Sequence, residues 1–160
     1  IILIIVFFFL TMLLANSDEL IVEIDNPKFS EKGLNDRVYE IKAKKGFKSD
    51  NELELHIIEG KFKTEKNGKW IYLEADKGNF SQTTNFIELE KNIIFYTEDG
   101  EKIRSNYATF DMNNDLIKLS ENVSHENIEG LILSDSSVIT NNFNKIMYLG
   151  NVETIIKNSN

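Results

Sequence analysis

Three segments of the chain share one pattern: IELEKNI at Ile87–Ile93, IKLSENV at Ile117–Val123 and IMYLGNV at Ile146–Val152. They recur at intervals of about 30 residues, as structural repeats do. In each, large apolar residues stand five and three positions before an asparagine, and an aliphatic residue follows it. This alternation is typical of a β-strand with one apolar face, and asparagine favours a break. The pattern predicts a repeated strand that is interrupted at Asn92, Asn122 and Asn151.

The repeat extends upstream and contains a second strand. Seventeen residues before each asparagine stands a small residue, an aliphatic residue precedes it by two positions, and a large apolar one follows it by five. The small residues are Ala75, Ser105 and Ser134. Polar pairs such as Asn113 and Asn114 separate the two strands of a unit, and Asn67–Gly68, Asp99–Gly100 and Glu129–Gly130 separate one unit from the next. Such pairs suit tight turns with positive φ, so each unit is predicted to be a hairpin.

An earlier and more divergent copy precedes these three. It has Gly60 in the place of the asparagine, Leu55 and Ile57 as its apolar pair, and Ile41 with Ala43 at its head. The chain is therefore predicted to contain four copies of a two-strand unit.

The composition agrees with a single β-structured domain. The chain has 160 residues, 41% of them hydrophobic, and only one proline. Its net charge of −8 argues against a nucleic-acid partner, which needs a basic surface. The absence of cysteine excludes disulfides, thiol catalysis and iron–sulfur ligation.

The first residues form a separate apolar segment. Ile1–Leu14 read IILIIVFFFLTMLL without a charge. We interpret residues 1–15 as a hydrophobic anchor, in the form of a transmembrane helix that lacks part of its length, residues 16–19 as a linker, and residues 20–157 as the β-domain. A cleavable signal peptide is the alternative, and both place the β-domain outside the cytoplasm.

One face of each predicted strand is apolar, and these faces must meet in a shared interior. The expected architecture is an all-β sandwich or jelly roll that is open along one side, although a closed and dry core would give the same periodicity. The residues predicted to line the interior are Ile41, Leu55, Ile57, Leu73, Phe80, Ile87, Leu89, Ile103, Phe110, Ile117 and Leu119. Both ends of the domain are predicted to be exposed sheet edges that partner strands can extend, with Leu20, Val22, Ile24, Val152 and Ile155.

Three features together resemble the LptC family, which is similar in fold to LptA and other OstA-like proteins. They are VYEIKAKKGF at Val38–Phe47, LEADKGNF at Leu73–Phe80, and the recurring Asn-Val endings. The resemblance implies a twisted, open β-jelly roll preceded by one transmembrane helix of the inner membrane, with the β-domain in the periplasm. It further implies that the protein receives lipopolysaccharide from an inner-membrane ABC transporter and passes it to an LptA-like periplasmic bridge protein by strand addition. A soluble LptA-like carrier and a structural scaffold of the envelope with a closed core are the alternatives.

The sequence offers little for catalysis. The only two histidines, His56 and His125, lack a second ligand at metal-binding spacing and are expected on polar strand faces. The acidic pairs Glu74 with Asp76 and Glu88 with Glu90 are expected to face outward. We therefore predict no enzyme activity, no metal and no cofactor. A lysine cluster forms either an ordinary solvated surface or a rim for sugar phosphates, and it comprises Lys42, Lys44, Lys45 and Lys48.

Overall fold

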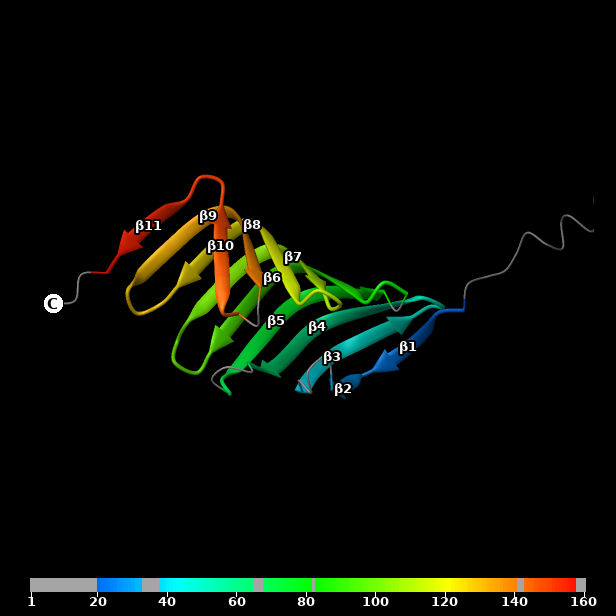
Figure 1. The fold of residues 1–160 in the computed structure, drawn as a ribbon. Helices are drawn as coiled ribbons and strands as arrows, with labels where there is room; N and C mark the ends of the chain where they lie inside the picture. The colour runs from blue at the N-terminus through cyan, green and yellow to red at the C-terminus, as the bar shows by residue number, and fades with distance from the viewer. Residues whose placement is uncertain (1–19, 33–37, 65–67, 82, 141–142, 158–160) are drawn as a thin grey trace, which may run out of the picture.

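The computed structural model describes residues 20–32, 38–64, 68–81, 83–140 and 143–157 (Figure 1). Over these ranges the chain forms eleven strands, all in one antiparallel sheet, and no helix. The strands are β1 (Val22–Asp25), β2 (Lys28–Lys32), β3 (Val38–Lys48), β4 (Glu52–Lys63), β5 (Trp70–Ser81), β6 (Phe86–Thr97), β7 (Lys102–Asp111), β8 (Leu116–Glu126), β9 (Gly130–Thr140), β10 (Lys145–Leu149) and β11 (Glu153–Ile156). The predicted all-β fold class is confirmed for these residues.

The membrane anchor predicted for residues 1–15 lies outside the described residues. Within the described ranges, no helix is long and apolar enough to cross a membrane.

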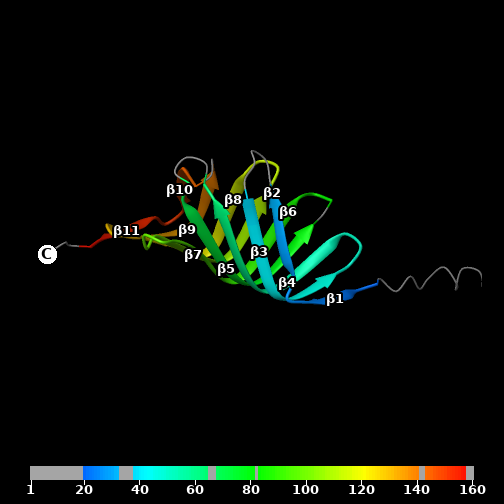
Figure 2. The same cartoon turned by 90° about the horizontal axis from the view of Figure 1, so that it is seen from below.

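The sheet follows the order of the chain from β3 to β9 and divides in two at each end. β3 pairs along one edge with β2 over residues 38–42 and with β1 over residues 45–48. In the same way, β9 pairs with β11 over residues 130–133 and with β10 over residues 136–140. Two short strands therefore continue each terminal long strand, and Figures 1 and 2 show β1 and β11 at opposite ends of the body.

The long strands bend near their midpoints, where the predicted breaks lie. The register between neighbours shifts at Glu90/Ile93 and Ser120/Val123, and Asn92 and Asn122 have φ of 50° and 59°. Asparagine tolerates this left-handed conformation better than most residues. At these corners the Nδ2 of Asn92 donates to Asp76 over 2.8 Å, and the Nδ2 of Asn151 donates to Asp135 over 2.9 Å. Asn92 and Asn122 thus sit at bends within a strand, whereas Asn151 lies between β10 and β11.

The bends divide the sheet into two halves, which we call arm A and arm B. Arm A comprises β2, β11 and residues 38–43, 58–63, 70–75, 93–97, 102–105, 123–126 and 130–134. Arm B comprises β1, β10 and residues 45–48, 52–56, 77–81, 86–90, 107–111, 116–120 and 136–140. The inner faces of the arms meet: a Cβ on Gly78 of arm B would lie 2.7 Å from Cδ1 of Ile58 in arm A.

The core lies between the arms and follows the predicted alternation. Its most deeply buried apolar residues include Ile93, Leu119 and Ile139. Burying one such side chain is worth roughly 1.5–3 kcal/mol, so this core supplies the main stabilisation of a sheet that has no helix to cover it within the described ranges.

Two predictions about the repeat are wrong. In the first copy the corner is at Ile57, with φ of 55°, and not at Gly60, which lies on the inner face of arm A. The β4–β5 ladder pairs His56 with Lys77 and Ile58 with Ala75, so its break falls at Ile57 on β4 and at Asp76 on β5.

The pair Glu129–Gly130 was predicted to need positive φ. Gly130 instead begins β9 with an ordinary φ, and the turn is held by the side chain of Asn127, whose Oδ1 accepts from the amides of Glu129 and Gly130. The glycine is required by close packing, because a Cβ would lie 2.2 Å from the carbonyl oxygen of Ile155 in β11. At Gly100, by contrast, φ is 92°, as predicted for a turn.

Candidate functional site

A cavity of about 320 Å³ lies between the inner faces of the two arms. Most of its walls are aliphatic and aromatic, and β2 to β8 all contribute to them. The lining residues are Phe29, Glu40, Ile41, Leu53, Leu55, Ile58, Gly60, Lys61, Phe62, Leu73, Gly78, Asn79, Phe80, Ile87, Leu89, Phe95, Ala108, Phe110, Met112 and Ile117. This volume is at the small end of the range of ligand sites, and the predominance of apolar groups suits hydrocarbon.

Most of the residues predicted to line the interior do line this cavity. They are Ile41, Leu55, Leu73, Phe80, Ile87, Leu89, Phe110 and Ile117. Leu119 is buried in the core outside the cavity, and Ile103 borders a second, smaller cavity. Ile57 is placed differently from the prediction, because it is 57% exposed on the outer side of the bend.

Several lining residues were not predicted, and the bend explains the most important of them. Alternation continued straight through β4 from Leu55 selects Ile57, but the corner reverses the alternation and turns Ile58 inward instead. Phe62 follows the corner of β4 and could have been found by restarting the count there. Phe95 keeps the alternation of Leu89, because the corner of β6 contains two left-handed residues, Lys91 and Asn92. Phe29 belongs to β2, which the repeat pattern does not contain, and Met112 follows the last residue of β7.

Two glycines keep part of the cavity open. Gly60 and Gly78 are both on inner faces, one in each arm. At Gly78 a Cβ would lie 2.7 Å from Ile58 and 2.9 Å from Leu89, so no larger residue fits without displacement of these side chains. At Gly60 the nearest contact, with Leu73, would be 3.3 Å.

The polar groups of the cavity wall are close to electrically balanced. The carboxylate of Glu40 lies 3.7 Å from Nζ of Lys61, 3.6 Å from Lys28 and 3.4 Å from Lys42. Desolvation opposes ionisation of Glu40, but these lysines together lower its pKa. Lys61 also lies over the ring of Trp70, with Nζ 5.2 Å from the ring centroid. The wall therefore offers no concentrated charge.

The four lysines of the predicted cluster all belong to β3. Lys42 bonds Glu40, and Lys45 bonds both Glu23 and Asp25, which raise its pKa. None of the four lysines of the cluster lines the cavity.

The second cavity, of about 150 Å³, lies on the far side of Phe95 and has a more polar wall. It is bordered by Ile103 of arm A, by Glu101, which immediately precedes β7, and by Phe143 and Ile146, which belong to the turn between β9 and β10 and to β10.

His125 lies next to Glu101 and does not occupy the polar face predicted for it. It is 7% exposed on the inner face of arm A, where Nδ1 bonds the hydroxyl of Tyr148 and Nε2 lies 2.8 Å from Glu101. The hydrogen bond with His125 lowers the pKa of Glu101, and burial raises the pKa of Tyr148 to about 12. This bonded triad joins β10 of arm B to arm A. His56, in contrast, is partly exposed and bonds Glu54 over 2.6 Å.

The predicted edge residues lie at the two ends of the sheet. Leu20, Val22, Val152 and Ile155 are all exposed, and Ile24 is half-buried. Within the described chain, β1 pairs only with β3 and β11 only with β9, so each has one edge that is not paired.

The acidic pairs take part in ordinary outward-facing bonds. Glu74 accepts from the hydroxyl of Tyr96, Asp76 from Asn92, and Glu88 from the hydroxyl of Tyr107. No cluster of three or more potential metal ligands occurs among the residues whose placement is described.

A scan against protein-family models found no match, and a search of curated proteins found no similar sequence.

Proposed function

We propose that this protein is a lipid-transfer subunit that holds the acyl chains of lipopolysaccharide between its two arms, as a β-jelly roll of the LptC kind. The observation that carries the proposal is the apolar cavity, which both arms line and which has few polar groups. Hydrocarbon gains roughly 0.8 kcal/mol for each methylene removed from water, without any need for directional contacts. The near-neutral wall at Glu40 and Lys61 leaves the sugar phosphates outside the cavity.

The proposed place of the protein is between an inner-membrane ABC transporter, which supplies the lipid, and an LptA-like periplasmic protein, which receives it. Residues 1–15 would hold the chain in the inner membrane, with the β-domain in the periplasm. The β1 end follows this segment in the sequence and would face the membrane, and β11 would face the periplasm. Among the described strands, β1 and β11 each have one edge without a partner, which supports partner binding by strand addition, because such an edge offers free amides and carbonyls. We propose no catalytic step, metal or cofactor.

Site-specific photocrosslinking in cells tests the cavity. A photoreactive amino acid at Leu89 or Phe110 would point into the cavity, whereas the same group at Ile57 would point outward from the bend. The proposal predicts lipopolysaccharide adducts from the two inner positions and none from Ile57.

Equal labelling from all three positions would mean that lipid contacts the inner and outer faces of the sheet without preference for the cavity, and would overturn the proposal. Absence of adducts at Leu89 and Phe110, in a variant that remains folded, would favour a scaffold with a closed core and would overturn the proposal.

A further inference from the structure

The strongest unassigned feature of the interior is the aromatic wall between the two cavities. Phe95 is 4% exposed and lines both of them. Phe143 lies behind it, on the side of the smaller cavity, with ring centroids 5.6 Å from Phe95 and 5.2 Å from Phe62. Phe62 and Phe95 belong to arm A, whereas Phe143 stands in the turn between β9 and β10 that leaves arm B. The wall is thus closed by a side chain from the opposite arm.

Phe143 is held there at a conformational cost. Its φ is 61°, in the left-handed region that bulky residues rarely adopt. Such conformations persist where the surroundings impose them, and they concentrate at functional positions. Two contacts impose it here: the aromatic packing against arm A and the bond between Tyr148 of β10 and His125 of arm A.

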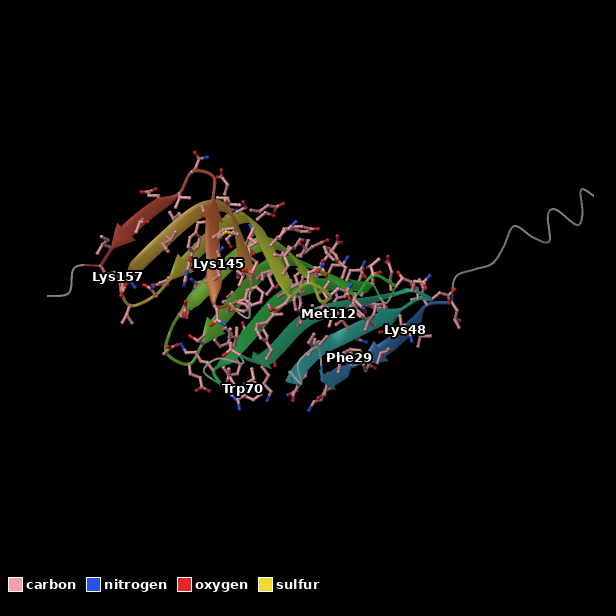
Figure 3. The ribbon with its side chains drawn as sticks, in the orientation of Figure 1. Phe29, Lys48, Trp70, Met112, Lys145 and Lys157 are labelled. Atoms are coloured by element: carbon pink, nitrogen blue, oxygen red, sulfur yellow. The ribbon has the colours of Figure 1, made fainter. Side chains whose placement is uncertain are left out.

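Phe29 and Phe95 lie in one row across arm A, four strands apart, because the register pairs Phe29 with Ile41, Ile41 with Gly60, Gly60 with Leu73 and Leu73 with Phe95. Phe29 is 39% exposed and Phe95 is 4% exposed, so this row is open at its Phe29 end, which Figure 3 shows well away from Lys145 on β10. A chain that enters beside Phe29 would therefore meet Phe95 as the limit of the apolar space. Beyond it the smaller cavity continues, lined by Ile71, Ile103 and Ile146 as well as polar groups.

We infer that Phe143 is a specificity-determining residue that sets the length of the acyl chain the protein accepts, by backing the Phe95 ring that separates the two cavities. The inference rests on the proposed function, since it requires that hydrocarbon enters the larger cavity. Removing the Phe143 ring frees Phe95 to move and joins the two spaces. Each further methylene that then leaves water should increase affinity about fourfold.

The test uses the full chain, kept in solution by an amphipathic scaffold peptide in place of detergent and without added lipid. The probes are decanoic, tetradecanoic and octadecanoic acids, each with a diazirine at the terminal carbon. After illumination, the adducts are quantified and mapped by mass spectrometry. In the wild type, decanoic acid should label at least as well as octadecanoic acid. In Phe143→Ala, octadecanoic acid should label several-fold more strongly than in the wild type, with adducts at Ile103 or Ile146.

Two controls keep the test decisive. Phe143→Leu retains most of the bulk of the side chain and should give an intermediate length profile, which keeps the test valid if Phe143→Ala folds poorly. Ile128→Ala changes a side chain that is 85% exposed and should behave as the wild type. Unchanged decanoic acid labelling shows that the variants keep the cavity. An unchanged length profile in both Phe143 variants would overturn the inference and leave the proposed function standing. Absence of labelling by any acid in the wild type would instead overturn the proposed function, and this inference with it.

Discussion

Ile57 and Ile58 are neighbours in β4 that should respond in opposite ways to substitution. Ile58 is 3% exposed, and truncation of a buried isoleucine to alanine costs about 2–5 kcal/mol. Because Ile58 already borders the cavity, we expect Ile58→Ala to lower the free energy of unfolding by about 2–3 kcal/mol, at the lower end of that range. Ile57 is 57% exposed, so Ile57→Ala should change it by less than about 0.5 kcal/mol.

A third substitution tests the bend itself. Ile57 has φ of 55°, which is costly for a β-branched residue, whereas asparagine occupies the corresponding corners at positions 92, 122 and 151. Ile57→Asn should therefore raise the free energy of unfolding by about 0.5–1 kcal/mol, since it relieves a left-handed cost of roughly 1–2 kcal/mol and loses some apolar contact.

Urea denaturation, followed by circular dichroism and by the fluorescence of Trp70, the only tryptophan, measures the free energy of unfolding of all three variants. For a chain of this size, 1 kcal/mol corresponds to a shift of roughly 2–4 °C in Tm, which provides a second reading. The reasoning is refuted if Ile57→Ala costs as much as Ile58→Ala, because β4 would then continue without a bend. A loss of stability in Ile57→Asn would contradict the assignment of the corner to that residue.

Two further substitutions probe the ends of the sheet. Tyr148→Phe removes the hydroxyl that bonds buried His125 and should lower the free energy of unfolding by about 1–3 kcal/mol at neutral pH. Burial raises the pKa of Tyr148 to about 12, so its contribution should be complete below its ordinary pKa of about 10 and disappear as pH rises through about 12. Denaturation of both proteins across this window should show the difference between them shrinking, and a constant difference would contradict this pKa. Gly130→Ala places a Cβ 2.2 Å from the carbonyl oxygen of Ile155 and should release β11, seen as faster hydrogen exchange at its amides. Gly60→Ala, where the nearest contact is 3.3 Å, is the control, and protection of β11 in both variants would argue against the close packing at Gly130.

Periodicity was sufficient to predict the strands and their inner faces wherever the strand runs straight. It placed Ile87 and Leu89 correctly because both lie on the same side of the corner at Asn92. It failed at Ile57, because a single left-handed residue exchanges the inner and outer faces of everything that follows it on the strand. The first copy has no asparagine to mark that residue, so the position of the corner depended on tertiary pairing that the local sequence does not record.

The triad of His125, Tyr148 and Glu101 also could not be predicted from the local sequence pattern. The position of His125 relative to Val123 is that of an inner-face residue, but a histidine is usually solvated. Its burial depends on Tyr148 of β10 and on Glu101, which immediately precedes β7. Tyr148 lies 23 residues further along the chain, and Glu101 lies 24 residues before it. Such long-range compensation of a buried polar group follows from topology and not from any one segment.

Native mass spectrometry of the full chain, extracted in mild detergent, tests most directly whether hydrocarbon enters the space between the arms. The comparison is between the wild type and Ala108→Leu, with Ile128→Leu as a surface control. Ala108 lines the cavity and is 1% exposed, so a leucine there adds bulk to the cavity wall. The account predicts an acylated lipid bound to the wild type and to the surface control, with clearly lower occupancy in Ala108→Leu. Equal occupancy in all three proteins, or no bound lipid in the wild type, would contradict it.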